Sequence, residues 1–468
     1  MPESHKMDAV AAALEALEAA QAERGRLAEL GRWTEADEAA VRTLRWVLAD
    51  AVPAVVGPDV SRLIYVAGRP RPALQEQRRG NSAIVPPERL SAVQGMLLVN
   101  HGNDAPAAAE LAHRALESFT WRDVDTFWNC ILVLLYLDDF EAAQRYCERA
   151  MARAGWAASS ALTVLRARIA ASTGDAATAV RLLVPVVTNG DEDQFTEVGV
   201  AWAIEALVDL DELDRADELM RAHALAGSLD AVVDRAEVLG ARGLLSRAAG
   251  RPESAYEDFV ACGRELVGWG VTNPAVNPWR SRAALCAAAT GREAVALPLA
   301  EEELSSARRW GTARAVGTAL RAVGLIRADG DGKTLRNAVQ LLTRSRALGT
   351  LMESQYELAL KLRLEGHHQE VVPVLRALRE NALSAHNMAW LARADSAIRR
   401  WAANAETAKL TSRERQVANL AQAGFSNGGI ADRLQLKIST VEFHLSNVYR
   451  KLVIGGRSEL RAIRVPIL

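Results

Sequence analysis

Apolar residues recur at helical spacing through almost all of the chain up to Glu406, with few alternating β-branched runs. Within this region a turn residue, usually Gly or Asp, is followed five residues later by a small apolar residue that opens an apolar helix. The pairs are Gly31 and Ala36, Gly68 and Ala73, Gly102 and Ala107, Asp138 and Ala143, Gly174 and Ala179, Asp211 and Ala216, Gly250 and Ala255, Gly291 and Ala296, and Gly366 and Val371, with a looser copy at Gly330 and Ala338. The pattern predicts helix pairs joined by tight turns, in which the small residue lets the two helices pack closely.

Successive turn residues lie 34 to 41 residues apart, which is the length of one helix–turn–helix repeat. The tetratricopeptide repeat (TPR) resembles this pattern most. A helix pair cannot bury its apolar face alone, so neighbouring pairs stack into a solenoid with a concave groove. We therefore predict an all-α fold in which residues 1–398 form a TPR-like helical-repeat solenoid that acts as a sensor or interaction domain.

The copy at Gly68 is irregular. Pro70, Pro72 and the pair Pro86–Pro87 interrupt helix formation around it. Residues 78–87 are accordingly expected to form a loop or an irregular insertion.

Tryptophan and cysteine are both placed in apolar helical runs. Trp46, Trp128, Trp202 and Trp390 either pack between helices, the simpler interpretation, or line a ligand groove. The cysteines, at positions 130, 147, 262 and 286, have no C-x-x-C spacing, so buried reduced thiols are favoured over metal ligands or disulfides.

Charge is distributed unevenly. The formal net charge is −2, but residues 406–468 contain ten Lys/Arg and five Asp/Glu, a balance of +5, which leaves −7 for the rest. A small basic end on a large acidic body fits a chain that contacts a polyanion at its terminus. No stretch approaches the ~18 apolar residues of a membrane span, and the N-terminus lacks the apolar core of a signal peptide. We expect a cytoplasmic protein that does not associate with membranes.

No arrangement typical of an enzyme stands out. Gly332-Lys333-Thr334 matches the end of a phosphate-binding loop, but Arg327 occupies the position of the first glycine and a repeat turn replaces the preceding strand. His367–His368 lies in a polar turn, and there is neither a Ser/His/Asp set nor a pair of catalytic carboxylates. We therefore predict no enzymatic activity, no cofactor and no metal.

The last domain, residues 410–468, begins with a helix-capping pattern. Thr411 with Glu414 forms a capping box, and a first helix then extends to Gln422. A second short helix follows Ser426-Asn427, and a third is expected over about 438–452. Residues 399–409 are predicted to be a linker that acts as a hinge.

The third helix has two different faces. Val441, Leu445, Val448 and Leu452 lie on one inward face, while the opposite face carries polar and basic residues together with Phe443. Two short helices that present such a face are the arrangement that enters a DNA major groove. Its early residues would reach base edges, where Glu442 could accept a hydrogen bond from a cytosine amino group. Arg450, Lys451 and Arg457 would meet phosphates.

At these residues a family becomes recognisable. Leu410-Thr411-x-x-Glu414, Gly424-Phe-Ser-Asn427-x-x-Ile430-Ala431-x-x-Leu434, Thr440-Val441-Glu442-x-His444-Leu445 and Tyr449-Arg-Lys451-Leu452 closely resemble the LuxR-type helix-turn-helix domain over about 55 residues. The resemblance implies that Glu442, Phe443 and Ser446 lie next to bases. It also implies DNA-backbone contacts, which we assign to Asn427, Lys437, Thr440, Asn447, Arg450, Lys451 and Arg457. The family's dimerisation helix corresponds to about Ser458–Ile463.

Several positions depart from the family pattern. The family usually has Glu at Gly429, Ser at Lys437 and Gly at Val453, and less flexible residues at Gly455 and Gly456. Glycines cost helix stability, roughly 1 kcal/mol each relative to Ala. Lys437 gives up an N-cap hydroxyl and adds a positive charge near the phosphates.

A second resemblance lies upstream. Asn273-Pro274, Pro278-Trp279-Arg280-Ser281, Glu301-Glu302-Glu303, Arg309-Trp310-Gly311 and Leu320-Arg321…Gly324 resemble the repeat region of the large ATP-dependent LuxR-type regulators. Those regulators carry an N-terminal nucleotide-switch module, and no equivalent is visible in this sequence. The chain is expected to be a short member of that group or a fragment of one.

These features favour a transcription regulator whose repeats sense a small molecule or a protein, and we expect it to be an activator. Its C-terminal domain would bind double-stranded promoter DNA as a homodimer and act with RNA polymerase. The alternative is a protein-interaction scaffold or anti-regulator in which the DNA-binding domain is weakened, as the glycines at 428–429 and 455–456 suggest.

Overall fold

The computed structural model describes most of the chain between residues 87 and 457, together with positions 23, 26–27, 65–67 and 460. The gaps after residue 87 are 119–122, 154, 157–158, 190–192, 328–331, 366, 408–410, 453–455 and 458–459. The described residues form helices and turns without any strand, which confirms the all-α prediction. Among them no helix is both long and apolar enough to span a membrane.

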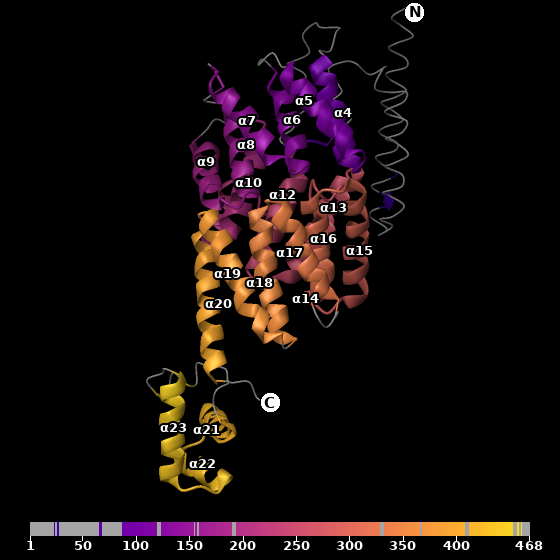
Figure 1. Ribbon diagram of the computed structural model, residues 1–468. Coiled ribbons are helices and arrows are strands. Elements are labelled where there is room, and N and C mark those ends of the chain that lie inside the picture. Colours follow the sequence, from indigo (N-terminus) through magenta and orange to yellow (C-terminus); the bar gives the residue numbers. More distant parts are fainter. Residues whose placement is uncertain are drawn as a thin grey trace, which may run out of the picture.

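The helices follow one another in antiparallel pairs (Figure 1). They are α4 (Pro87–His101), α5 (Ala105–Glu117), α6 (Val124–Tyr136), α7 (Phe140–Met151), α8 (Ser160–Ser172), α9 (Ala176–Asn189), α10 (Thr196–Asp209), α11 (Leu213–Ala222), α12 (Arg235–Ala248), α13 (Pro252–Gly268), α14 (Trp279–Ala289), α15 (Glu293–Trp310), α16 (Ala313–Ile326), α17 (Lys333–Ser345), α18 (Leu348–Leu364), α19 (His368–Ser384), α20 (Met388–Thr407), α21 (Ser412–Gln422), α22 (Asn427–Leu434) and α23 (Ile438–Leu452). The even-numbered helices from α4 to α18 open the pairs. The prediction of a TPR-like solenoid is confirmed.

The predicted turn residues end the first helix of each pair. The six turn residues from Gly102 to Gly291 all have a left-handed backbone, which suits Gly and is tolerated by Asp: they are Gly102, Asp138, Gly174, Asp211, Gly250 and Gly291. After each of them, the next residue donates its N–H to the carbonyl five residues earlier, as Asp139 does to Leu134 at 2.9 Å and Arg292 to Ala287 at 2.8 Å. This is the Schellman arrangement, which satisfies the carbonyls at a helix end.

The small residue five positions later lies where the second helix meets its partner. Ala143, Ala179, Ala216, Ala255 and Ala296 are fully buried, as are Ala338 and, nearly so, Val371. The first described copy is shifted by one residue, because Ala108 is buried and Ala107 is half-buried. In the loose copy, Gly332 has the left-handed backbone, and Gly330 lies outside the described residues. Gly366 and the copies at Gly31 and Gly68, with residues 78–86, also lie outside them.

The solenoid closes on itself after about five repeats. Turns in the N-terminal half contact the C-terminal half through hydrogen bonds between residues 171 to 181 positions apart. The bonds are Thr272 Oγ1 to the His101 carbonyl (3.0 Å), Asn273 Nδ2 to the Val99 carbonyl (2.7 Å), Trp310 Nε1 to the Tyr136 carbonyl (2.9 Å), Arg314 Nε to Asp138 Oδ1 (2.7 Å), Asn387 Nδ2 to Asp209 Oδ2 (2.8 Å) and Trp390 Nε1 to Asp209 Oδ1 (2.9 Å). Figure 1 shows the result: α4 to α9 are stacked above α13 to α19. The fold is therefore a superhelix whose second turn packs against its first.

The residues that carry the upstream resemblance make buried polar contacts, some of them between the two turns of the superhelix. Asn273 and Trp310 make two of the bonds between the turns. Glu303 accepts hydrogen bonds from the backbone N–H groups of Arg280 (3.0 Å) and Ser281 (3.1 Å) and so caps α14. Arg321 pairs with Glu353 and Glu357 of α18. The motif is thus explained by packing and buried polar pairing.

Aromatic and charged side chains from the helices that open the pairs, α8 to α14, converge inside the superhelix. Arg168 Nη1 lies 2.5 Å from Glu205 Oε2, and its guanidinium lies 4.6 Å from the centre of the Trp202 ring. Trp202 Nε1 donates to Glu237 Oε2 at 3.0 Å, and Arg282 pairs with Glu205. Burial raises the pKa of Glu237, whereas Arg168 and Arg282 outweigh burial and lower the pKa of Glu205. The interior that we expected to be an open groove is lined by buried polar pairs.

The tryptophans and cysteines are buried as the simpler interpretation predicts. Trp128 and Trp202 stack with ring centres 5.9 Å apart, and Trp390 is also buried; Trp46 lies outside the described residues. All four cysteines are free and buried, and burial raises the pKa of the Cys147 thiol to about 12.

Two connecting segments take a definite form. The predicted hinge at 399–409 is helical as far as the structure describes it, because α20 continues to Thr407. Gly332 is the N-cap of α17, and Lys333 and Thr334 are the first residues of that helix. The sequence that resembles a phosphate loop therefore lies at a helix start, and the described element before it is the helix α16.

Candidate DNA interface

The C-terminal domain is built on a short three-helix core. Thr411 Oγ1 accepts a hydrogen bond from the Glu414 N–H, and Glu414 Oε2 accepts one from the Thr411 N–H, so the predicted capping box is present. Val417, Ala421 and Ile430 are fully buried between α21, α22 and α23. α20 contacts α23 directly, and α22 lies at the end of the domain farthest from the solenoid (Figure 1).

The second helix, α22, is capped by one side chain. Ser426 Oγ accepts from the Gly429 N–H at 3.1 Å. Gln435 then takes a left-handed backbone and ends the helix, and the Leu436 N–H donates to the Ala431 carbonyl at 2.9 Å. This tight turn fixes the direction in which α23 begins.

The third helix presents one apolar face inward and one mixed face outward. Val441, Leu445 and Val448 are buried, as the spacing predicts. Glu442, Phe443 and Ser446 are exposed, and the Phe443 side chain is 64% exposed although it is apolar. An exposed aromatic ring on a polar helix face is suited to contact the methyl group of thymine. The predicted base-proximal residues therefore share one accessible face.

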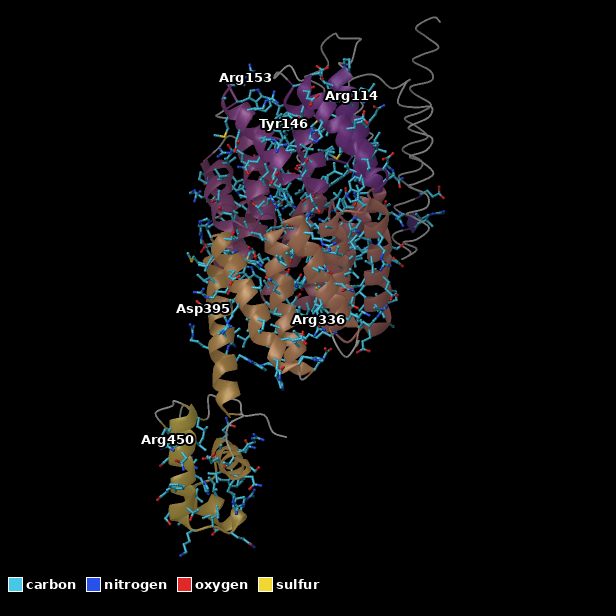
Figure 2. All side chains as sticks on the ribbon, viewed as in Figure 1. Arg114, Tyr146, Arg153, Arg336, Asp395 and Arg450 are labelled. Atoms are coloured by element: carbon cyan, nitrogen blue, oxygen red, sulfur yellow. The ribbon has the colours of Figure 1, made fainter. Side chains whose placement is uncertain are left out.

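The predicted backbone-contact residues surround that face unevenly. Lys437 and Arg450 are exposed, and Thr440 and Asn447 are half-buried. Arg450 Nη2 donates to Asn447 Oδ1 at 2.9 Å, and Figure 2 shows Arg450 on α23. Lys451 belongs to α23, but its side chain lies outside the described residues. These positions remain predictions as DNA contacts.

Arg457 and Asn427 are engaged within the domain. Arg457 Nη2 donates to the Phe425 carbonyl at 2.6 Å, and its Nη1 donates to Asn427 Oδ1 at 3.1 Å. Asn427 Nδ2 is 3.5 Å from Glu442 Oε1. The three side chains thus join the start of α22 to α23, which the sequence did not indicate, and any phosphate contact by Arg457 would involve a guanidinium that is already bonded.

Two exposed residues at the start of α23 were not among the DNA contacts predicted from the sequence. Ile438 is 52% exposed and Ser439 is exposed. The available signal was the spacing: Ile438, Glu442 and Ser446 follow each other at four-residue intervals and so lie on one face. Arg433 was also missed; its guanidinium lies 4.0 Å from the centre of the Phe425 ring.

The predicted dimerisation helix at 458–463 lies outside the described residues except for Leu460. Leu460 is fully buried in the domain core. Its carbonyl accepts a hydrogen bond from Gln422 Nε2 at 2.8 Å. This residue is therefore used within the domain.

The arrangement of α21, α22 and α23 is that of a helix-turn-helix domain. Residues 408–463 match the family described as "Bacterial regulatory proteins, luxR family". The C-terminal domain is a LuxR-type domain, as its motifs predict.

Relatives match this chain over the same kind of short span. The "HTH-type transcriptional regulator MalT" of Vibrio campbellii and that of Vibrio parahaemolyticus are each 45% identical over 53 residues, which is 11% of this chain and 6% of those proteins. The chain therefore aligns with a small part of these relatives.

Two solved structures share a general likeness. A Rap protein complexed with competence and sporulation factor aligns over 80% of this chain and 99% of its own, with 11% identity and a TM-score of 0.47. The APC/C hetero-tetramer Cut9–Hcn1 aligns over 94% of this chain and 89% of its own, with 14% identity and a TM-score of 0.41.

Proposed function

We propose that this protein is a DNA-binding transcription regulator that inserts α23 into the major groove of promoter DNA. The observation that carries the proposal is the outward face of α23, where Glu442, Phe443 and Ser446 are exposed within a LuxR-type domain. Base edges are read by such side chains, and nearby Lys437 and Arg450 supply phosphate contacts.

The finer roles follow from the family resemblance and the arrangement of the chain. The solenoid senses a small molecule or a protein, and the domain binds as a homodimer to half-sites about one DNA turn apart. The regulator acts on RNA polymerase, as an activator. The relatives named as transcriptional regulators support this assignment for the C-terminal domain.

Binding of the full chain to labelled genomic promoter fragments tests the proposal. We expect Phe443→Ala to weaken specific binding by ~1–3 kcal/mol through the lost base contact. Arg450→Ala should lower the slope of log K against log salt by about one, because one phosphate contact is lost. Arg181→Ala, an exposed arginine on α9, is the matched control and should change neither quantity. Failure of the unmodified chain to shift any fragment at low salt, with or without effectors, would contradict the proposal.

A scaffold or anti-regulator is the second candidate. The observation that favours it is α22, which has only eight residues, includes two glycines and is capped by Ser426 alone. The double change Gly429→Glu and Lys437→Ser restores the family's residues. A large gain in DNA affinity would favour weakened binding in the natural chain, and unchanged affinity would count against it.

A further inference from the structure

A three-residue stretch that precedes the first described helix pair lies inside the superhelix. Tyr65, Val66 and Ala67 are 3%, 8% and 1% exposed, although they belong to no helix. They are held by side chains from three helices that each open a helix pair, α4, α6 and α12. The stretch is therefore enclosed as a bound segment would be.

Its polar contacts are directed at backbone carbonyls and at one hydroxyl. Asn100 Nδ2 donates to the Tyr65 carbonyl at 3.0 Å, and Trp128 Nε1 donates to the Ala67 carbonyl at 2.6 Å. The Tyr65 hydroxyl donates to Glu237 Oε1 at 3.0 Å. The two bonds to backbone carbonyls would hold an extended chain of any sequence. The bond to Glu237 requires a hydroxyl, so it favours a tyrosine at this position.

The site has hydrogen-bonding capacity that the resident segment does not use. Asn100 is 1% exposed, and its Oδ1 is buried with no hydrogen-bond partner among the described residues. A buried acceptor without a partner costs free energy. Nδ2 of the same amide already holds a backbone carbonyl, so Oδ1 is the atom of this side chain that remains to accept an N–H from an extended backbone. The resident segment is thus an incomplete match for its own site.

Other contacts of the site residues do not involve that segment. Glu237 Oε2 is fixed by Trp202 Nε1, and Trp128 stacks on Trp202. Trp128 additionally packs against Phe195, with ring centres 4.4 Å apart. The donor and acceptor groups would therefore keep their positions when the occupant changes.

We propose that Asn100, Trp128 and Glu237 form a binding site for an extended peptide that carries a tyrosine followed two residues later by a small residue, and that Tyr65–Ala67 occupies this site until such a peptide displaces it. The inference rests on the sensing role proposed above and names the chemistry of the ligand. The tethered segment competes at high effective concentration, so a separate peptide binds more tightly when the segment is weakened.

A labelled heptapeptide that copies residues 63–69, Leu-Ile-Tyr-Val-Ala-Gly-Arg, is the probe. Its binding to the full chain is followed by fluorescence anisotropy. The Tyr65→Phe chain keeps the site and loses only the hydroxyl of the resident segment, and we expect it to bind the probe about tenfold more tightly than the unmodified chain. Tyr146→Phe is the matched control, because Tyr146 is a buried tyrosine on α7 (Figure 2). Its hydroxyl lies 3.4 Å from His113 Nδ1, away from the proposed site. This variant should bind the probe as weakly as the unmodified chain.

A change in the probe keeps the test decisive if Tyr65→Phe alters folding. A probe with Phe in place of Tyr should bind about tenfold more weakly to every chain. Equal binding of both probes, or no binding of either to Tyr65→Phe chains of native circular dichroism, would overturn the proposal and make the segment a fixed part of the fold. A stable dimer that Tyr65→Phe dissociates would overturn it in favour of exchange between two copies. DNA binding measured on the same preparations separates these outcomes from failure of the proposed function.

Discussion

The N-termini of α21 and α22 are capped by different sets of residues. Both helices carry a hydroxyl at the N-cap, but Glu414 completes the box in α21 whereas Gly429 holds the corresponding position in α22. A Cβ at Gly429 would lie 3.5 Å from Ser426 Oγ and 3.7 Å from Phe425 Cδ1, which is ordinary contact. The fold therefore leaves room for a side chain there, and glycine is not required by the backbone.

We expect Gly429→Glu to stabilise α22 by about 1–2 kcal/mol, because it removes a glycine from the first turn and supplies a carboxylate for the Ser426 N–H. Hydrogen exchange of the α22 amides in the full chain measures the change. Gly428→Ala is the control: a Cβ there would meet only Ser426 Oγ, at an ordinary contact distance of 3.9 Å, and should give only the helix-propensity gain, up to about 1 kcal/mol. Equal protection in the two variants would show that the carboxylate makes no cap.

Glu303 couples the fold to pH. Burial raises the pKa of its carboxyl from 4.5 to about 7, although the Arg280 and Ser281 N–H groups and the Arg280 charge favour the ionised form. The folded chain thus holds this proton more tightly than the unfolded chain. The stability that Glu303 contributes by binding this proton is fully present below about pH 4.5 and is lost as the pH rises to about 7.

For Glu303 the full difference corresponds to about 3 kcal/mol. We expect the free energy of unfolding of the unmodified chain to fall between pH 5.5 and 7.5 by about 2 kcal/mol more than that of Glu303→Gln. Denaturant titrations at the two pH values measure it, and the other buried carboxyls cancel because both chains contain them. Parallel pH profiles would contradict the assigned titration.

At the scale of elements, the turns between helices could be predicted from the sequence, but contacts between residues far apart in the sequence could not. Gly or Asp at a left-handed position, followed by a small residue, is a local requirement, so Asp138 and Ala143 could be recognised from sequence. The two faces of α23 follow equally from spacing. The bond from Arg457 to Asn427 could not be predicted, since it depends on where Arg457 lies relative to the start of α22 in the folded domain.

One element links the superhelix interior to the helix that leads to the DNA-binding domain. α10 carries Trp202 and Glu205 in the interior. Asp209 at its end accepts one hydrogen bond from Trp390 of α20 and one from Asn387, the residue before that helix. Burial raises the pKa of Asp209, and the bonds from Trp390 and Asn387 oppose that rise. A displacement of α10 would therefore be transmitted to α20.

Trp390→Phe tests this link by removing the indole donor and leaving Asp209 Oδ1 without it. We expect the amides of residues 388–398 to exchange faster, by an opening free energy lowered by about 1–3 kcal/mol. Trp401→Phe, on the same helix, is the control because its ring contacts His368 instead of Asp209. If both variants exchange alike, the hydrogen bond from Trp390 to Asp209 does not hold α20.

At the scale of the whole molecule, closure of the superhelix is the feature that sequence could not supply. A repeat of 34 to 41 residues predicts stacking, but the number of repeats per turn depends on a small rotation that accumulates over five repeats. Gly174 illustrates the consequence. Its left-handed backbone ends α8, and it also lies against Leu348 and Ala385 of the second superhelical turn.

Gly174→Ala tests the closure. A Cβ there would lie 2.8 Å from Leu348 Cβ and 3.2 Å from Ala385 Cβ, so the two superhelical turns must separate. Gly250 has the same position in its repeat and a left-handed backbone, but nothing lies within 4 Å of its Cβ. Gly250→Ala should therefore cost only the backbone strain, ~1–2 kcal/mol. Gly174→Ala should cost a further ~1–3 kcal/mol from overpacking. Denaturant unfolding measures the difference, and small-angle scattering should show an expanded chain for Gly174→Ala alone. Equal losses in the two variants would mean that the contact between the turns does not stabilise the superhelix.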